Sequence, residues 1–302
     1  MNSDTEFVSV IIPVYNDEER LATVLDCLER QSYPRDRYEV IVVDNASDRS
    51  PEATVSRFPQ ARLVSESRRG SYAARNRGLE VARGPLLAFT DADCIVPPDW
   101  LEAGVAALRD LDRHGLIAGD IRLRFKRPGR PNAAEIYDIV HGFNPERSAS
   151  NGFAYTGNAF THRSVFDAVG EFNAELLSRG DLEWGKRVAA AGMPVVYSAE
   201  AWIEHPARHR LSEILTKERR LMAGKVRMIA DDAWDRDPPE YSRFPWWTKI
   251  VPPLGQVLEL SRDPRLSGAW QRLRFVAIAF LTHYVRGLER IRLKIGGSAE
   301  RR

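Results

Sequence analysis

Short apolar runs alternate with amphipathic stretches over the first 120 residues of the chain. Four runs rich in branched and aromatic residues lie at positions 8–14, 38–43, 62–65 and 85–90. Runs of this length, bounded by polar turns, are typical of strands buried in a sheet. Apolar residues at three- and four-residue spacing follow Asn16, and the segments 71–82 and 100–108 are expected to be helices as well. This alternation predicts an α/β fold with a mostly parallel, Rossmann-like sheet that is covered by helices on both faces.

The rest of the chain has the pattern of a second unit followed by a tail. Glycine and proline residues between positions 124 and 150 indicate a loop-rich insertion. Strands are expected at 155–160 and 194–197, and helices at 181–191 and 211–229. An acidic segment at 231–240, which contains Pro238 and Pro239, indicates a linker to a C-terminal helical extension. The pattern therefore divides the chain into segments 1–120, 121–230 and 231–302.

Composition and charge narrow the class of protein. The chain has 302 residues, of which 43% are hydrophobic and 28% charged, as in ordinary globular proteins. Its formal net charge is only +2, so no overall field favours nucleic acid as a partner. Two cysteines cannot form a disulfide framework or a four-thiolate zinc site, which indicates a reducing compartment. The polar N-terminus does not resemble a signal peptide, and no sequence window reaches the roughly 18 apolar residues of a membrane span.

Several nucleotide- and metal-binding motifs do not occur in the sequence. The dinucleotide fingerprint with its GxG start, the P-loop pattern GxxxxGK[ST] and the hydrolase elbow GxSxG are all missing. His205 and His209 are four residues apart, but Pro206 lies between them and no glutamate completes HExxH. These observations argue against dinucleotide-binding, P-loop, serine hydrolase and zinc protease chemistry.

Polar side chains gather at the ends of three predicted strands. Tyr15 and Asn16 follow the first strand, Asp44 ends the second, and Asp91 and Asp93 follow the fourth. Ligands of parallel sheets bind beyond the carboxyl ends of the strands. Two carboxylates at positions i and i+2 of an extended chain point to the same side, and their repulsion favours a divalent cation shared with a diphosphate. The alternative is a pair of solvated turn residues.

Five short motifs occur in order along residues 8–210. They are VIIPVYN at 10–16, IVVDNASD at 41–48, ARNRG at 74–78, FTDAD at 89–93 and GDLEW at 180–184. With these motifs the chain resembles the family-2 inverting glycosyltransferases of GT-A fold, which transfer a sugar from a nucleotide diphosphate sugar. The last motif often reads Glu-Asp-x-Asp in that family, whereas this chain has Gly180 at the first position and Glu183 at the last.

The resemblance implies a donor site at the carboxyl edge of the sheet. The donor-binding residues that it indicates are Pro13, Tyr15, Asn16, Asp44, Arg75, Asp91 and Ala92. Asp44 would accept a hydrogen bond from a base N–H, or would only cap its own turn. Pro13 and Tyr15 would form a wall beside the base. Arg75 would contact the donor phosphate or brace Asp91, with a plain surface charge as the alternative.

The resemblance also implies a metal site and a base. A divalent metal, Mn²⁺ or Mg²⁺, is expected on Asp91, Asp93 and His205. Asp181 stands at the family's base position and would take the proton of an attacking hydroxyl, with Glu183 as the second candidate. Asp181 would otherwise cap its helix. Near the acceptor, Trp184 would stack on a sugar or pack in the core, and Asn158 matches a family loop.

These implications predict an enzyme of polysaccharide biosynthesis in the cell envelope. Residues 1–120 would bind the nucleotide sugar and residues 121–230 the acceptor. We expect hexose transfer from a nucleotide diphosphate sugar, a UDP-sugar in particular, to a hydroxyl of a saccharide or lipid-linked acceptor. The alternatives are an inactive sugar-nucleotide-binding scaffold and a nucleotidyltransferase, although the glycine-rich, lysine-containing early loop of the latter does not occur here.

The C-terminal segment predicts a basic amphipathic helix. Apolar residues lie at helical spacing at Phe275, Ile278, Leu281, Val285, Leu288 and Ile291. Basic residues surround them at Arg272, Arg274, Arg286, Arg290, Arg292 and Lys294. Such a helix suits an anionic membrane surface, and Trp246 and Trp247 upstream would suit the same interface. The alternatives are packing on the catalytic unit or on a second copy in a homodimer. The expected location is cytoplasmic, with peripheral contact at the inner face of the cell membrane in the first case.

Overall fold

The computed structural model describes residues 5–111, 114–230 and 254–297. The chain divides into two compact units, each built from several segments. Unit 1 comprises Met1–Arg122, Asn144–Leu176 and Gly180–His205. Unit 2 comprises Leu123–Phe143, Leu177–Arg179 and Pro206–Arg302. This grouping cuts across the three consecutive segments expected from the sequence, because a stretch from the middle of the chain joins the C-terminal helices.

A seven-stranded sheet forms the centre of unit 1, in the order β3-β2-β1-β4-β6-β5-β7. The strands are β1 (Val8–Val14), β2 (Tyr38–Asp44), β3 (Ala61–Ser65), β4 (Leu86–Thr90), β5 (Leu116–Arg124), β6 (Asn158–His162) and β7 (Val195–Pro206). The first four pair in parallel, and β6 runs antiparallel to both β4 and β5. Val14 lies opposite Asp44 in the register, so the carboxyl ends of β1 and β2 share one edge of the sheet.

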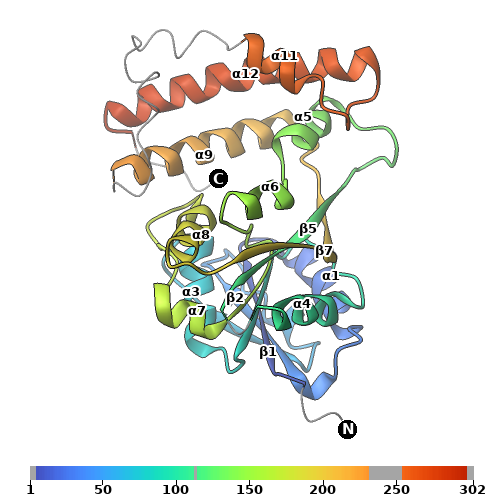
Figure 1. Cartoon of the computed structure of the whole chain (residues 1–302), viewed down its shortest axis with the longest axis vertical. Coiled ribbons are helices and arrows are strands. Elements are labelled where there is room, and N and C mark those ends of the chain that lie inside the picture. The colour runs from blue at the N-terminus through green and yellow to red at the C-terminus, as the bar shows by residue number, and fades with distance from the viewer. Residues whose placement is uncertain (1–4, 112–113, 231–253, 298–302) are drawn as a thin grey trace. The chain divides into compact units, whose positions relative to one another are not determined.

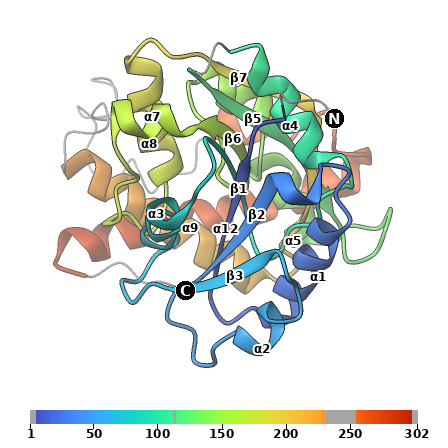
Figure 2. The same ribbon diagram turned by 90° about the horizontal axis from the view of Figure 1, so that it is seen from below.

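Helices cover both faces of this sheet. They are α1 (Glu18–Glu29), α2 (Glu52–Val55), α3 (Ser71–Val81), α4 (Trp100–Arg109), α6 (Pro145–Ser150), α7 (Arg163–Val169) and α8 (Gly180–Ala190). Figure 2 shows α1 and α4 on one side of the strands and α3, α7 and α8 on the other. The side chains of β1, β2 and β4 are buried almost throughout, as the continuous apolar runs require. The predicted α/β fold with a mostly parallel sheet is therefore confirmed.

The segment between residues 124 and 150 differs from the prediction of a loop-rich insertion. It contains α5 (Ala133–His141) and α6, and Asn132 begins α5 with a capping box. The Asn132 side chain accepts hydrogen bonds from the backbone N–H groups of Ala134 and Glu135, and the Glu135 carboxylate accepts one from Asn132 N at 2.7 Å. The prediction was wrong here because the prolines and glycines lie outside the two helices or, for Pro145, at the first position of α6, where proline does not interrupt a helix.

Unit 2 is helical. It contains α5, α9 (Leu211–Ala230), α11 (Leu254–Leu260) and α12 (Gly268–Lys294). Figure 1 shows α9 and α12 side by side, and both α5 and α11 contact α12. Their shared core contains the stacked rings of Tyr137 and Phe275, whose centroids are 6.1 Å apart. The predicted linker at 231–240, together with Trp246 and Trp247, lies outside the described residues. No described helix is long and apolar enough to cross a membrane.

Candidate metal and donor site

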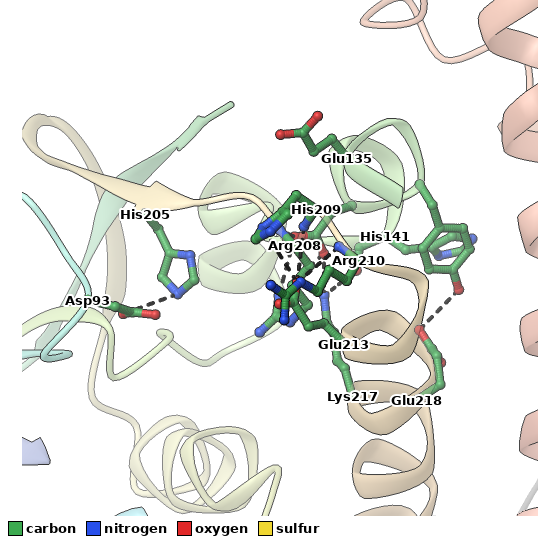
Figure 3. Close-up of polar contacts among 12 residues, drawn as sticks. Asp93, Glu135, His141, His205, Arg208, His209, Arg210, Glu213, Lys217 and Glu218 are labelled. Carbon is green, nitrogen blue, oxygen red and sulfur yellow. Dashed lines mark hydrogen bonds and ion pairs between the residues drawn. The ribbon is translucent and has the colours of Figure 1, made fainter. Parts of the chain in front are cut away.

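A hydrogen-bonded bridge joins the end of β4 to the end of β7. After Thr90 the chain turns, and Ile95 then pairs antiparallel with Glu204 through two N–H···O bonds of 2.9 Å. The bridge brings the neighbouring His205 to the turn, where His205 Nε2 lies 3.6 Å from Asp93 Oδ1 (Figure 3). The Asp91–Asp93 turn and the late histidine, distant in sequence, are thereby brought together by backbone pairing.

Three side chains at this turn form a candidate metal site. Asp91 and Asp93 are half-buried and His205 is buried, and one ligand atom from each lies within 4.8 Å of the other two. Ligands held about 2.2 Å from one ion are at most about 4.4 Å apart, so a small side-chain adjustment would let all three bind. Two carboxylate oxygens and one imidazole nitrogen suit Mn²⁺ or Mg²⁺, and the predicted ligand set therefore fits a divalent cation.

Each aspartate of the site has an arginine beside it. Arg75 of α3 is only 3% exposed, and its Nη2 donates to Asp91 Oδ1 at 2.5 Å. Arg20 of α1 is exposed, and its Nη1 lies 3.6 Å from Asp93 Oδ2. Ala92 is buried between the two carboxylates. Of the alternatives considered for Arg75, the structure shows the brace on Asp91. A buried guanidinium needs such a partner, so the pair fixes the orientation of Asp91.

The remaining predicted donor residues lie where β1 and β2 end. Asp44 is buried at the end of β2, and its Oδ1 accepts a hydrogen bond from Ser47 N at 3.1 Å. Asn16 adopts a left-handed conformation with φ 51°, and its backbone N–H donates to Ser47 Oγ at 2.9 Å. This hydrogen bond connects the loop after β1 to the loop after β2. Tyr15 is 39% exposed beside them, and Pro13 is half-buried within β1. Tyr15 therefore offers an accessible ring at this edge.

Asp181 stands at the start of α8, in contact with a tyrosine of α3. Its Oδ1 accepts hydrogen bonds from the Tyr72 hydroxyl at 3.1 Å and from Leu182 N at 2.9 Å. Burial, together with the negative charge of Asp181, raises the pKa of the Tyr72 hydroxyl, so this group remains a donor. A Cβ on Gly180 would lie 2.7 Å from two ring carbons of Tyr72. The Tyr72 ring thus fills the space that a side chain at position 180 would need.

Glu183, the second candidate base, is committed to an ion pair within α8. Arg187 donates to it through Nε at 2.7 Å and through Nη2 at 3.0 Å. The Glu183 side chain is only 12% exposed. Both carboxylate oxygens are therefore engaged, and Asp181 is the better placed of the two.

The two predicted acceptor residues lie in the core of unit 1. Trp184 is 2% exposed and stacks on Phe166 with ring centroids 4.3 Å apart. Asn158 is 1% exposed, and its side chain donates to Ala201 O at 2.7 Å and accepts from Trp100 Nε1 at 2.9 Å. These side chains pack and brace the core, which is the alternative given for Trp184, and neither residue is used in the function proposed below.

Two residues of the site were not predicted from the sequence. Tyr72 and Arg20 lie on the first helices after β3 and β1, next to recognisable motifs but outside them. The contact between Tyr72 and Asp181 joins positions 109 residues apart, and no local pattern signals it. The only sequence signal for Arg20 was its position in the first turn of a helix that follows β1, whose carboxyl end lies at the predicted ligand-binding edge of the sheet.

Unit 2 contains a buried ion cluster of its own. Figure 3 shows Arg208 and Lys217 converging, and both contact Asp138 of α5, at 3.3 and 2.8 Å. Burial opposes ionisation of Asp138, but these two cations hold the pKa of its carboxyl below the usual value. One turn further along α5, burial and the charges of Arg286 and Lys217 lower the pKa of His141 to about 4. The cluster fastens the start of α9 to α5.

The fold and the acidic site define a nucleotide-sugar glycosyltransferase of GT-A architecture. Among solved structures, the mannosyltransferase PcManGT from Pyrobaculum calidifontis, in complex with GDP-Man and Mn²⁺, is similar with a TM-score of 0.62 and 20% identity. The similarity covers 97% of this chain and 87% of that one. TarS 1–349 of S. aureus, in complex with UDP-GlcNAc, is similar with a TM-score of 0.53 and 17% identity, over 97% and 93% of the two chains. These likenesses show the fold.

Sequence comparison then gives the family. The profile described as Glycosyl transferase family 2 matches residues 9–170, more than half of the chain. The glycosyltransferase AglE of Haloferax volcanii is 37% identical over 234 residues, which are 76% of each chain. A validoxylamine A glucosyltransferase of Streptomyces hygroscopicus subsp. limoneus is 27% identical over 68% of this chain and about half, 52%, of its own length. The chain belongs to glycosyl transferase family 2.

Proposed function

We propose that this chain is a metal-dependent, inverting hexosyltransferase. It would transfer a sugar from a nucleotide diphosphate sugar, a UDP-sugar in particular, to a hydroxyl of a saccharide or lipid-linked acceptor. The observation that carries the proposal is the cluster of Asp91, Asp93 and His205, with ligand atoms within 4.8 Å, at the carboxyl edge of a parallel sheet. Arg75, which pairs with Asp91, also lies 5.7 Å from the centre of the Tyr72 ring, and Tyr72 in turn contacts the candidate base Asp181.

The donor is held by residues at the ends of four strands, β1, β2, β4 and β7. Asp91, Asp93 and His205 would bind a divalent ion, which supplies charge stabilisation for the departing nucleotide diphosphate. Asp44 accepts a hydrogen bond from a base N–H, and the exposed ring of Tyr15 covers the base. The brace of Arg75 on Asp91 keeps one carboxylate oriented before the donor arrives.

Asp181 acts as the general base in this proposal. It takes the proton of the acceptor hydroxyl while the new bond between that oxygen and the anomeric carbon forms. The bond from the anomeric carbon to the diphosphate oxygen breaks on the opposite face, which inverts the configuration. The Tyr72 hydroxyl holds one oxygen of Asp181 by a 3.1 Å hydrogen bond, which fixes the orientation of the carboxylate at the start of α8.

Calorimetric titration with UDP and Mn²⁺ tests the metal and donor site. Asp93→Asn replaces a charged ligand, so it should weaken Mn²⁺-dependent UDP binding by at least about 10-fold, the lower end of what loss of an outer-shell partner costs. Asp99→Asn is the matched control, because Asp99 is exposed at the start of α4 and its side chain makes no capping bond. Equal binding by Asp93→Asn and the control would remove Asp93 from the site. Running GDP beside UDP identifies the preferred base.

A turnover assay over a panel of sugar nucleotides and acceptors separates the alternatives. Asp181→Asn should retain donor binding and lose most turnover, and normal turnover by this variant would exclude the base assignment. Tight donor binding without transfer to any acceptor by the parent protein would favour the inactive scaffold. A further reaction with a nucleoside triphosphate and a sugar 1-phosphate tests the third alternative, because release of pyrophosphate with formation of a sugar nucleotide would favour a nucleotidyltransferase.

A further inference from the structure

Helix α12 has two apolar faces, and they have different surroundings. Its inner face contributes Phe275 and Ala279 to the core shared with α5 and α9. Its outer face is exposed to solvent. The single apolar stripe expected from the sequence combined the two faces, since Phe275 is buried whereas Leu281 and Leu288 are exposed. Packing within unit 2 therefore explains the apolar residues on the inner face of α12 but not those on its outer face.

The outer face of α12 forms a continuous apolar line. Its members, with their exposed fractions, are Trp270 (64%), Leu273 (57%), Leu281 (38%), Tyr284 (44%), Leu288 (65%) and Ile291 (37%). Spacings of three, four or eight residues place them on one side of the helix, over a length of about 32 Å. Exposed apolar residues are usually scattered singly, and a contiguous patch indicates an interaction site. We call these six residues the α12 outer line.

The net charge of α12 indicates which kind of partner binds its outer line. Six basic residues and one acidic residue occur in Gly268–Lys294, a formal net charge of +5. The single acid, Glu289, is 6% exposed and paired with Arg292 at 2.7 Å. The guanidinium of Arg274 lies 5.1 Å from the centre of the Trp270 ring on the outer line. Two copies that met through this face would bring like charges together, whereas an anionic lipid surface is complementary to it.

We infer that the outer line of α12 docks unit 2 onto an anionic lipid surface. The apolar side chains would enter the boundary between headgroups and acyl chains, and the flanking basic side chains would meet lipid phosphates. Trp270 and Tyr284 suit this depth, because each combines an apolar ring with a polar group. The inference does not depend on the proposed chemistry, since vesicle binding requires neither metal nor nucleotide.

Vesicle co-sedimentation with the full chain tests this inference. The probes are vesicles of phosphatidylcholine alone and vesicles in which roughly one third of the lipid is phosphatidylglycerol. The double variant Leu281→Asp/Leu288→Asp removes two apolar anchors and adds two negative charges. Leu211→Asp is the matched control, because Leu211 is 39% exposed at the first position of α9 and is not part of the α12 outer line. Circular dichroism of each variant verifies that the helices remain folded.

The parent chain should bind the anionic vesicles and not the neutral ones, and added salt should weaken the binding. The double variant should lose about tenfold or more in partition coefficient, and Leu211→Asp should behave as the parent. No binding to anionic vesicles by the parent would overturn the inference. Equal binding by the double variant would overturn it as well. A dimer in sedimentation that the double variant dissociates, without vesicle binding, would assign the face to a second copy instead.

Discussion

Gly180 is the residue at which this chain departs most visibly from the family motif, and its surroundings allow a quantitative test. A Cβ at this position would meet Tyr72 Cδ2 and Cε2 at 2.7 Å and Cγ at 2.9 Å. An aromatic ring cannot deform, so Gly180→Ala forces the ring or the start of α8 to move, at a cost of about 1–3 kcal/mol. The gain in helix propensity is at most about 1 kcal/mol and is smaller in a first turn. We therefore expect a net loss of about 1–2 kcal/mol in the free energy of unfolding.

Urea unfolding of four variants measures this loss and assigns its cause. Gly255→Ala in α11 is the matched control, because no atom lies within 4 Å of a Cβ placed there, and its stability should stay level or rise. In a Tyr72→Ala background the clash is gone, so Gly180→Ala should then cost at least about 1 kcal/mol less than it does alone. If Gly180→Ala is as stable as the parent, or costs the same in both backgrounds, the steric explanation fails.

Three further variants address the site and unit 2. Tyr72→Phe keeps the ring but removes the hydroxyl, so kcat should fall about tenfold while UDP affinity stays unchanged; an unchanged kcat would exclude a positioning role. Arg75→Ala removes the buried partner of Asp91, whose carboxylate is one-third exposed and stays partly solvated, so the variant should lose about 1–3 kcal/mol of stability by urea unfolding. An unchanged stability would mean that the pair is not structural. The pKa of His141 is about 4 in the folded chain and 6.5 for an ordinary histidine. Between pH 6.5 and pH 4 the unfolded chain therefore binds a proton at this histidine that the folded chain does not bind. The free energy of unfolding falls as the pH drops through this range. His141→Phe should remove about 2–3 kcal/mol of this decline between pH 7 and pH 4, and parallel curves for parent and variant would refute the assignment.

The sheet and the position of the ligand edge were predictable because their causes are local. β1, β2 and β4 are continuous apolar runs, and each boundary lies within one residue of the prediction. Their parallel arrangement follows from the helices between them, which places Asp44, Asp91 and Asp93 at one edge without any knowledge of long-range contacts. Asp91 and Asp93 could be proposed as metal ligands for the same reason, whereas His205 was proposed only from the resemblance to the family.

The features that were missed depend on contacts between distant segments. β5 was not predicted, although it pairs with β6 and lies between β6 and the edge strand β7 in the sheet. The capping box of Asn132 and Glu135 was readable, but neighbouring prolines and glycines obscured it. The burial of Trp184 and the fit of Tyr72 against Gly180 depend on side chains from other elements, which no local pattern encodes.

The interleaved path of the chain has a consequence for anyone who recombines it with its relatives. Unit 2 consists of the residues after His205 together with Leu123–Phe143 and the short stretch Leu177–Arg179. Tyr137 from the first internal stretch stacks on Phe275 of α12. A chimaera that exchanged only the C-terminal helices would set a foreign α12 against a native α5. A working exchange has to transplant both pieces at once, so the internal stretch and the tail are expected to diversify as a pair.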